Sequence, residues 1–304
     1  MMKRINKTGN RIQRGDKMKR ILPFIVCVIL MPVVLARADV SENVAKLIQA
    51  VKDGKTETVQ TLLAGGLSPD IADEKGLRVL VWAANNGHAD VVRLLLDKGA
   101  EIDPKKTSTG IAALFMASKN GHADVVKLLL DKGVDVNAKQ QDTGLTALFM
   151  ASQNGYTDVV RLLLDKGAEV DARRTDGATA LFMASQGGHA EIIKLLLDKG
   201  VDVNAKENIR GGTALMAASQ EGHIEAVKLL LGKGADVNAK QTTTGVTALF
   251  MASQEGHAEV VKILLEKGAD MNAKRAGGAT ALSVATARGH SEVVRLLTAK
   301  GAGD

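Results

Sequence analysis

The 304-residue sequence is poor in cysteine, proline and aromatic residues. Its single cysteine excludes a disulfide framework and any zinc or iron–sulfur site built from several cysteines. With five Phe, one Tyr, one Trp and four Pro, the core must consist mainly of leucine, valine and alanine. This composition favours helices over strands. The content of hydrophobic residues, 45%, indicates a folded chain rather than a disordered one.

The excess of positive charge is confined to the first residues. The formal net charge is +6, but residues 1–38 hold nine Lys and Arg against one acid, Asp16. Residues 39–304 therefore carry 31 basic and 33 acidic side chains. Because this larger part has a small net negative charge, we expect no binding to nucleic acid.

Residues 1–38 have the features of a secretory signal peptide. Lys19-Arg20 precede an apolar stretch over 21–36, and an Ala-Arg-Ala sequence follows at 36–38. A charged start, a short apolar run and a small-residue end are typical of such signals. A helix over this run would span about 24 Å, short of the ~30 Å hydrocarbon core of a bilayer.

We therefore expect cleavage after Ala38 and export to the periplasm or the medium, with no membrane span in the processed chain. Met18 offers an alternative start that would give the signal a conventional length. An uncleaved inner-membrane anchor is the other interpretation of the same segment.

The remainder of the sequence is periodic. A glycine followed by histidine or a substitute recurs at intervals of 33 or 34 residues, at Gly54, Gly87, Gly121, Gly155, Gly188, Gly222, Gly256 and Gly289. A fixed period of this size indicates a solenoid of stacked units.

Each unit is predicted to hold two helices and a loop. In the unit at 144–172, Thr146 caps a first helix, and Gly155 ends it in a left-handed conformation. A second helix begins near Asp158, whose charge suits the helix N-terminus, and ends at Gly167. The chain then enters a turn rich in Gly, Thr and Lys, which we call a finger.

These motifs closely resemble the ankyrin repeat family over residues 41–302. The sequence of 144–172, GLTALFMASQNGYTDVVRLLLDKGAEVDA, contains the G-x-T-A-L, N-G-H-like, V-V-x-L-L-L and K-G-A-x-V motifs at their family positions. One departure is systematic, because Thr-Ala-Leu-Phe at 146–149, 179–182 and 247–250 replaces the family's Thr-Pro-Leu-His. Alanine at the first helical position costs little. We expect Phe or Met to replace the polar network of the lost histidine by apolar packing.

The resemblance implies an all-α solenoid of about eight helix-turn-helix-finger units. After the signal peptide over 1–38 we expect an N-terminal capping repeat at 39–70, six internal repeats at 71–272 and a C-terminal capping repeat at 273–304. In the last repeat Thr298 replaces the leucine of earlier repeats, as suits an outer face with no following neighbour.

No catalytic, metal or cofactor site emerges from the sequence. Six histidines share one repeat position, but stacked helices lie about 8–10 Å apart, too far for these side chains to share an ion. We expect each to be satisfied at the turn into the second helix. They are His88, His122, His189, His223, His257 and His290. We therefore expect no enzyme activity and no cofactor.

The first helices present a row of methionine and amide side chains toward the groove in which ankyrin proteins usually bind partners. Polarizable methionine suits an adaptable apolar surface, although packing between repeats would produce the same row. Trp82, the single tryptophan, is the best candidate for an anchor. The predicted groove residues are Trp82, Asn85, Met116, Lys119, Met150, Gln153, Met183, Gln186, Gln220, Met251 and Gln254.

The fingers form a second, basic row. Such a row could steer an acidic protein surface toward the groove, although a solvated solubility face is the alternative. The predicted finger residues are Lys105, Lys106, Lys139, Arg173, Arg174, Lys206, Arg210, Lys240, Lys274 and Arg275.

These features lead to one functional hypothesis. The resemblance implies a non-catalytic module that binds a partner protein, and the signal peptide implies that it does so after export. We expect the chain to be a monomer. A periplasmic accessory that stabilises or inhibits a resident enzyme and a secreted protein that engages a foreign protein both remain open.

Overall fold

A computed structural model describes residues 41–103 and 108–302. The expected signal peptide lies outside these residues. Within them, no helix is long and apolar enough to cross a membrane.

The described residues form eight helix pairs, and their extended structure is limited to two isolated β-bridges, Ala72 with Arg78 and Arg173 with Thr179. Residues 41–52 are helical and pair with the first of the second helices. The other first helices are α3 (Val79–Asn85), α5 (Thr109–Lys119), α7 (Ala147–Gln153), α9 (Ala180–Gln186), α11 (Ala214–Gln220), α13 (Ala248–Glu255) and α15 (Ala281–Arg288). The second helices are α2 (Thr56–Ala64), α4 (Ala89–Asp97), α6 (Ala123–Asp131), α8 (Thr157–Asp165), α10 (Ala190–Asp198), α12 (Ile224–Gly232), α14 (Ala258–Glu266) and α16 (Ser291–Ala299).

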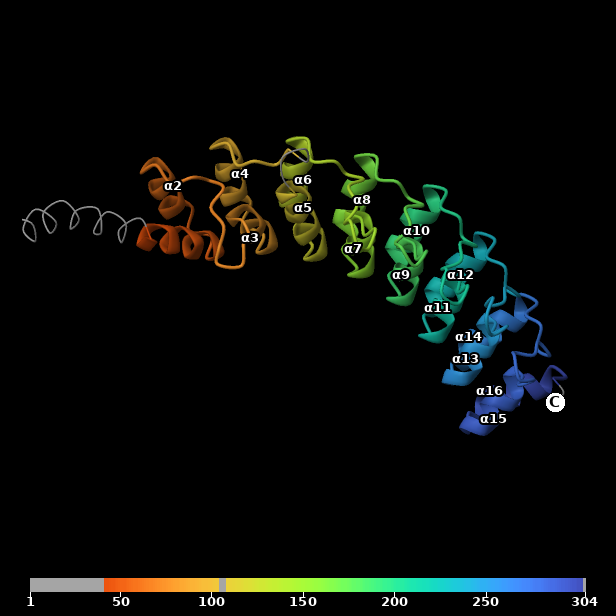
Figure 1. Cartoon of the computed structure of the whole chain (residues 1–304). Helices are drawn as coiled ribbons and strands as arrows, with labels where there is room; N and C mark the ends of the chain where they lie inside the picture. Colours follow the sequence, from red (N-terminus) through yellow and green to blue (C-terminus); the bar gives the residue numbers. More distant parts are fainter. Residues whose placement is uncertain (1–40, 104–107, 303–304) are drawn as a thin grey trace, which may run out of the picture.

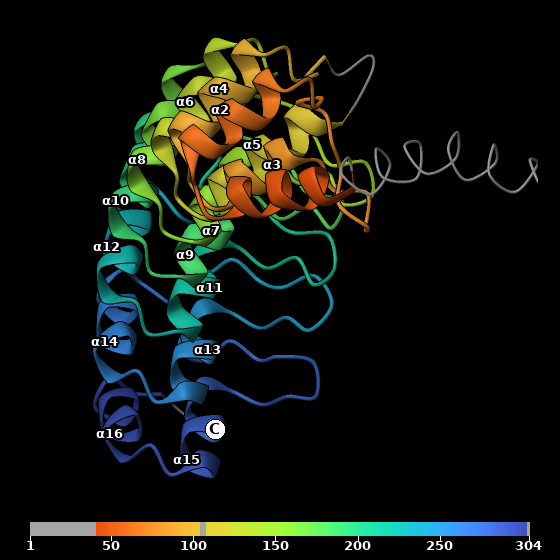
Figure 2. The ribbon, with the colours of Figure 1, turned by 90° about the vertical axis from the view of Figure 1, so that its left-hand side faces the viewer.

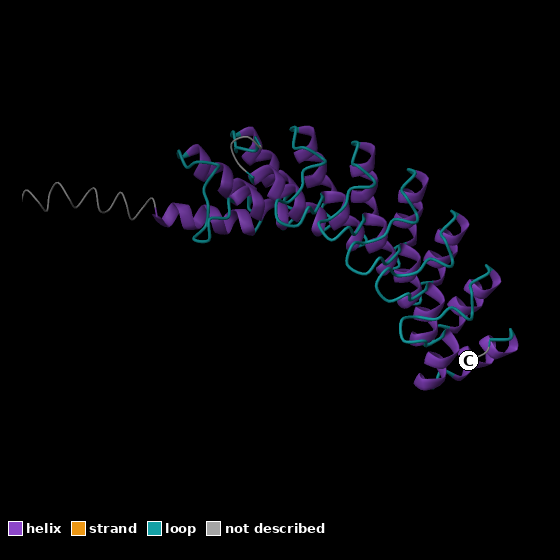
Figure 3. Ribbon diagram, turned by 45° about the vertical axis from the view of Figure 1, so that its right-hand side comes forward, coloured by secondary structure: helices purple, strands orange, loops and turns teal. Residues whose placement is uncertain are grey.

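The pairs stack side by side into a curved solenoid (Figure 1). The second helices form the convex layer and the first helices the concave layer (Figures 1 and 2). The fingers extend beyond the first helices to one side of the arc (Figure 2), and loops link helices throughout (Figure 3). The predicted all-α solenoid is therefore confirmed.

Local sequence sets the helix ends as predicted. The Thr146 hydroxyl accepts a hydrogen bond of 3.2 Å from the Phe149 amide at the start of α7. Gly155 takes a φ of +77° after this helix and Gly167 a φ of +87° after α8. Because L side chains rarely adopt such angles, glycine is the residue that allows each chain reversal here.

The core runs without interruption between the two helix layers. In one repeat Leu148 and Ala151 of α7 face Val159, Val160 and Leu163 of α8, all at most 1% exposed. Each repeat buries the corresponding positions against its neighbours, so one extended core replaces a globular centre.

The alternation between periods of 33 and 34 residues originates in the fingers. In the part of the chain that the structure describes, a backbone hydrogen bond closes six fingers, across four residues in the short ones and five in the long ones. The short fingers are closed from Asp73 to Leu77, Arg174 to Ala178 and Arg275 to Ala279, and the long ones from Gln140 to Leu145, Glu207 to Gly212 and Gln241 to Val246. The extra residue therefore projects from the tip and leaves the helix packing unchanged.

Apolar packing occupies the position of the family's histidine, as expected. Phe149 and Phe250 are 2% and 3% exposed. The guanidinium carbon of Arg174 lies 5.4 Å from the Phe149 ring centroid, and that of Arg275 lies 5.7 Å from the Phe250 ring centroid. An arginine of the next finger thus covers each ring by a cation–π contact.

Candidate functional site

The predicted groove residues come together as two rows on successive first helices. These helices contact one another from α3 through α15, which brings equivalent positions side by side. Trp82, Met116, Met150, Met183 and Met251 are half-buried and so can contribute both to packing and to an accessible surface.

The neighbouring amide row is the more exposed of the two. Lys119, Gln153, Gln186 and Gln220 are exposed, and Asn85 and Gln254 are half-buried. The Gln254 amide donates to Glu255 Oε1 at 2.7 Å, and the Asn85 side chain accepts from Asn120 Nδ2 at 3.0 Å. The exposed part of this row therefore runs from α5 to α11.

Contacts within the chain hold the Trp82 side chain in place. Its indole N–H donates to Asp73 Oδ2 at 2.9 Å, and the Lys52 ammonium lies 4.2 Å from the ring centroid. The hydrogen bonds from the Leu77 amide and from the Trp82 indole hold the pKa of Asp73 below its ordinary value. Trp82 therefore links three segments of the first two repeats, besides any role in binding.

The histidines join consecutive repeats. The Nε2 atom of each lies within hydrogen-bond distance of a carbonyl oxygen at the end of the preceding first helix, and the bond lengths are 2.9–3.2 Å. Each ring also packs on the preceding glycine turn, where a Cβ added to Gly222 would lie 2.6 Å from His257 Nδ1. No group of three or more His, Cys, Asp and Glu within the described ranges could hold a metal ion.

The basic finger row divides into engaged and available side chains. Arg174 forms an ion pair with Asp176, which raises the arginine pKa and lowers the aspartate pKa through the shared hydrogen bonds. Arg173 donates to the Lys206 carbonyl at 2.9 Å, and the Lys206 ammonium donates to the Lys240 carbonyl at 3.1 Å.

The available cations lie along most of the solenoid. Lys139, Arg210, Lys240 and Lys274 are exposed and form no ion pair within residues 41–103 and 108–302. Lys105 and Lys106 lie outside the described residues. Part of the row thus reinforces the fingers, and the rest can face a partner.

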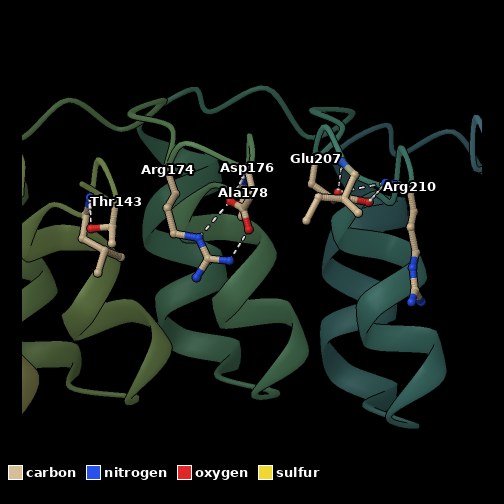
Figure 4. Close-up of polar contacts among 8 residues, drawn as sticks. Thr143, Arg174, Asp176, Ala178, Glu207 and Arg210 are labelled. Carbon is tan, nitrogen blue, oxygen red and sulfur yellow. Dashed lines mark hydrogen bonds and ion pairs between the residues drawn. The ribbon is translucent and has the colours of Figure 1, made fainter. Parts of the chain in front are cut away.

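Backbone hydrogen bonds tie five successive fingers together at their tips. An amide of each later finger donates to a carbonyl of the preceding one, at 2.7–2.9 Å. The four links join Thr175 to Thr143, Asn208 to Asp176, Thr242 to Arg210 and Ala276 to Thr244. We call the fingers at 139–145, 173–178, 206–212, 240–246 and 274–279 the tethered fingers. Figure 4 shows the turns at Arg174–Asp176 and Glu207–Arg210 from this row.

The tethered fingers include a residue that sequence reasoning missed. Ile209 is 65% exposed at the tip of the 206–212 finger. Its register position holds Asp142 and Thr243 in the other long fingers of the row. The sequence signal was an isoleucine at a position where the equivalent repeats carry polar residues. This signal becomes visible when the fingers are aligned by their closing hydrogen bonds.

Comparison with known proteins agrees with this architecture. A family model described as ankyrin repeats matches residues 47–140, 109–174, 148–241 and 239–303. An ankyrin repeat-containing protein of Schizosaccharomyces pombe is 39% identical over 54 residues, 18% of this chain and 26% of that protein. An ankyrin repeat and MYND domain-containing protein of Mus musculus is 39% identical over 67 residues, 22% of this chain and 7% of that protein.

The matched segments thus span about a quarter or less of these relatives, whereas the family model spans nearly all described repeats. The chain belongs to the ankyrin repeat family, whose repeats generally form non-catalytic modules for protein–protein interaction.

Proposed function

We propose that this chain is exported and binds one partner protein through the tethered fingers and the exposed amide row beside them. The observation that carries the proposal is the line of four tip-to-tip hydrogen bonds. Loops that are already fixed lose little conformational freedom on binding, so they suit recognition of a partner surface. The exposed Gln153, Gln186 and Gln220 can add adaptable hydrogen bonds beside them.

Charge supports a partner with an acidic surface. Lys139, Arg210, Lys240 and Lys274, which form no ion pair with other described residues, lie on the finger side, whereas the chain beyond residue 38 has a small negative charge. Complementary charge increases the association rate and this effect is screened by salt. We expect binding to weaken as sodium chloride is raised from 50 to 500 mM, measured by titration of the purified complex. An unchanged dissociation constant would remove charge steering from the proposal.

Site-specific photo-crosslinking in the producing cells tests the surface itself. Crosslinkers replace Gln153 and Gln186 on the concave layer and, as matched controls, Arg161 and Lys194 on the convex layer. The captured protein is then identified, purified and titrated with Gln186→Arg and Lys194→Ala variants. We expect weaker binding for Gln186→Arg alone. Equal capture from both layers, or equal affinities, would contradict the proposal.

Cell fractionation tests whether the chain is exported and distinguishes a periplasmic protein from a secreted one. Recovery from the periplasm supports an accessory of a resident enzyme, and recovery from culture medium supports engagement of a foreign protein. Recovery in the cytosol with residues 1–38 intact would overturn export. Turnover of any substrate by the purified chain, abolished by a single substitution, would overturn the non-catalytic assignment.

A further inference from the structure

Ile209 stands out on the surface of this chain. Among the residues that the structure describes, Ile209 and Ile224 are the large hydrophobic side chains with high exposure, at 65% and 38%. Ile224 lies at the start of the convex helix α12, whereas Ile209 lies at the tip of a finger. Isolated exposed hydrophobic residues are common on proteins, so the inference depends on how this one is held.

A neighbouring carboxylate fixes the loop that carries Ile209. The Glu207 side chain accepts hydrogen bonds from the amides of Ile209, Arg210 and Gly212, the last two at 2.8 and 2.9 Å. The equivalent residues Gln140 and Gln241 accept instead from a threonine hydroxyl of their own fingers. Glu207 therefore gives this finger an internal support that differs from that of its neighbours (Figure 4).

The tethers place Ile209 at the centre of the finger row. The 206–212 finger is the third of the five tethered fingers. Asn208 donates to Asp176 on one side at 2.7 Å, and Arg210 accepts from Thr242 on the other at 2.9 Å. Both residues adjacent to Ile209 are thus bound to other fingers. Residues that dominate binding energy cluster near the centre of an interface, where water is excluded.

Exposed cations belong to the same finger as Ile209 and to the next finger. Arg210 follows Ile209 directly, and its side chain extends away from Glu207 (Figure 4). Lys240 begins the next finger, whereas the Lys206 ammonium is engaged by the Lys240 carbonyl. The Glu207 charge is directed into the loop by its three backbone hydrogen bonds. The chemistry offered outward is therefore one aliphatic side chain among positive charges.

We infer that Ile209 is the central anchor of the partner interface, and that it inserts into an apolar pocket rimmed by carboxylates on the partner protein. This inference rests on the proposed function and specifies its partner. Glu207 acts as the positioning residue, because it holds the loop and leaves the isoleucine free to insert.

The repeats supply matched controls for a test on the full chain. A photo-crosslinker is placed at position 209 and, for comparison, at the equivalent positions 142 and 243. The protein captured preferentially from 209 is identified, purified and titrated with wild type, Ile209→Thr, Thr243→Ser, and the double variant Ile209→Thr/Thr243→Ile, which moves the isoleucine by one finger. Thermal unfolding shows whether each variant remains folded, and we expect no change because both side chains are exposed.

We expect Ile209→Thr to weaken binding at least about tenfold, as for an interface hot spot, and Thr243→Ser to change it less than about twofold. The double variant should bind as weakly as Ile209→Thr. A partner that binds wild type and Ile209→Thr equally would overturn the anchor but leave the proposed function standing. Failure to capture protein from any concave or finger position would overturn both.

A membrane surface is the other contact that an aliphatic tip among cations could make. Sedimentation with vesicles of phosphatidylglycerol and phosphatidylcholine measures it directly, with wild type and Ile209→Thr. We expect no difference between the two chains. Vesicle binding that is lost in Ile209→Thr would overturn the inference of a protein pocket.

Discussion

At the scale of single residues, one threonine begins each first helix from α7 to α15. Its hydroxyl accepts the amide hydrogen of the residue three positions later, at 3.1–3.4 Å. The second helices have no side-chain cap of this kind, because their N-cap residues are Lys55 in α2, Tyr156 in α8 and histidines in the others. Those histidines bond to the preceding repeat instead, so the two helix starts of a repeat serve different purposes.

Removing one of these caps should destabilise the solenoid. We expect Thr146→Ala to lower the free energy of unfolding by about 1 kcal/mol, because the Phe149 amide loses its acceptor. Urea unfolding followed by circular dichroism measures the change. Thr175→Ala, on an exposed finger, is the control and should have little effect. Equal losses in both variants would argue against the cap.

Unlike the threonine caps, a buried serine in five first helices destabilises the fold. Ser118, Ser152, Ser185, Ser219 and Ser253 are 0% exposed, and within the described residues none of their hydroxyl oxygens has a hydrogen-bond partner. Burial of a hydroxyl without a partner costs free energy. The chain itself carries alanine at the equivalent position of an earlier repeat, Ala84, also 0% exposed.

We therefore expect Ser152→Ala to raise the free energy of unfolding by about 1 kcal/mol, since the backbone and its packing stay the same. Differential scanning calorimetry should show a higher melting temperature. Ser152→Val, which adds volume to a close-packed helix interface, should lower it. A lower melting temperature for Ser152→Ala would mean that the hydroxyl has a partner in solution.

At the scale of elements, α12 differs from the other second helices at its last residue. The internal second helices end in Asp97, Asp131, Asp165, Asp198 and Glu266, whereas α12 ends in Gly232. A Cβ added to Gly232 would meet nothing within 4 Å. Glycine in a helix costs about 0.5–1 kcal/mol relative to alanine, so α12 ends less stably than its neighbours.

Filling this position should stabilise the C-terminal half of the solenoid. We expect Gly232→Ala to raise the free energy of unfolding by about 0.5 kcal/mol or more through helix propensity. Gly222→Ala is the contrasting variant, because Gly222 has a φ of +75° and its added Cβ would strike His257. Urea titrations of both variants should give changes of opposite sign, and changes of the same sign would contradict the assignment.

At the scale of the whole molecule, a row of ion pairs joins the ends of successive second helices. Each aspartate pairs with a lysine of the next repeat: Asp97 with Lys132, Asp131 with Lys166, Asp165 with Lys199 and Asp198 with Lys233, at 2.7–3.7 Å. The pairs are solvent-exposed, so each contributes little and salt weakens it. Gly232 interrupts the row, which therefore supports the N-terminal and central repeats.

This row predicts how stability depends on pH. A hydrogen bond from Lys166 lowers the pKa of Asp131 from its ordinary value of 3.8, and Lys233 does the same for Asp198. A carboxylate whose folded-state pKa is lowered stabilises the fold fully above its unfolded pKa. The contribution is lost as the pH falls through the folded pKa.

We therefore expect the melting temperature to hold from pH 7 to about 5 and to fall as the pH drops below about 4. The double variant Asp131→Asn/Asp198→Asn should show a shallower fall over the same range, and so should wild type in 1 M sodium chloride. An identical fall in the double variant would assign the acid sensitivity to other carboxylates.

The sequence by itself determined the repeat and its local ends. The spacing of glycines, the threonine caps and the Val-Val-x-Leu-Leu-Leu faces act over a few residues, so the period of 33 or 34 residues was sufficient to predict the all-α solenoid. Apart from Lys105 and Lys106, which lie outside the described residues, the predicted groove and finger residues lie on first helices and fingers, and their role in binding stays a prediction.

Only the tertiary structure decided which of these side chains are available. Arg174 and Lys206 belong to the basic row by sequence, but contacts to Asp176 and to the Lys240 carbonyl occupy them. The tip-to-tip bonds that surround Ile209 join residues about one repeat apart, and the packing of neighbouring repeats brings them within reach. Contacts between repeats depend on how the units stack. The sequence pattern within one unit does not specify which residues of neighbouring units come within hydrogen-bond distance.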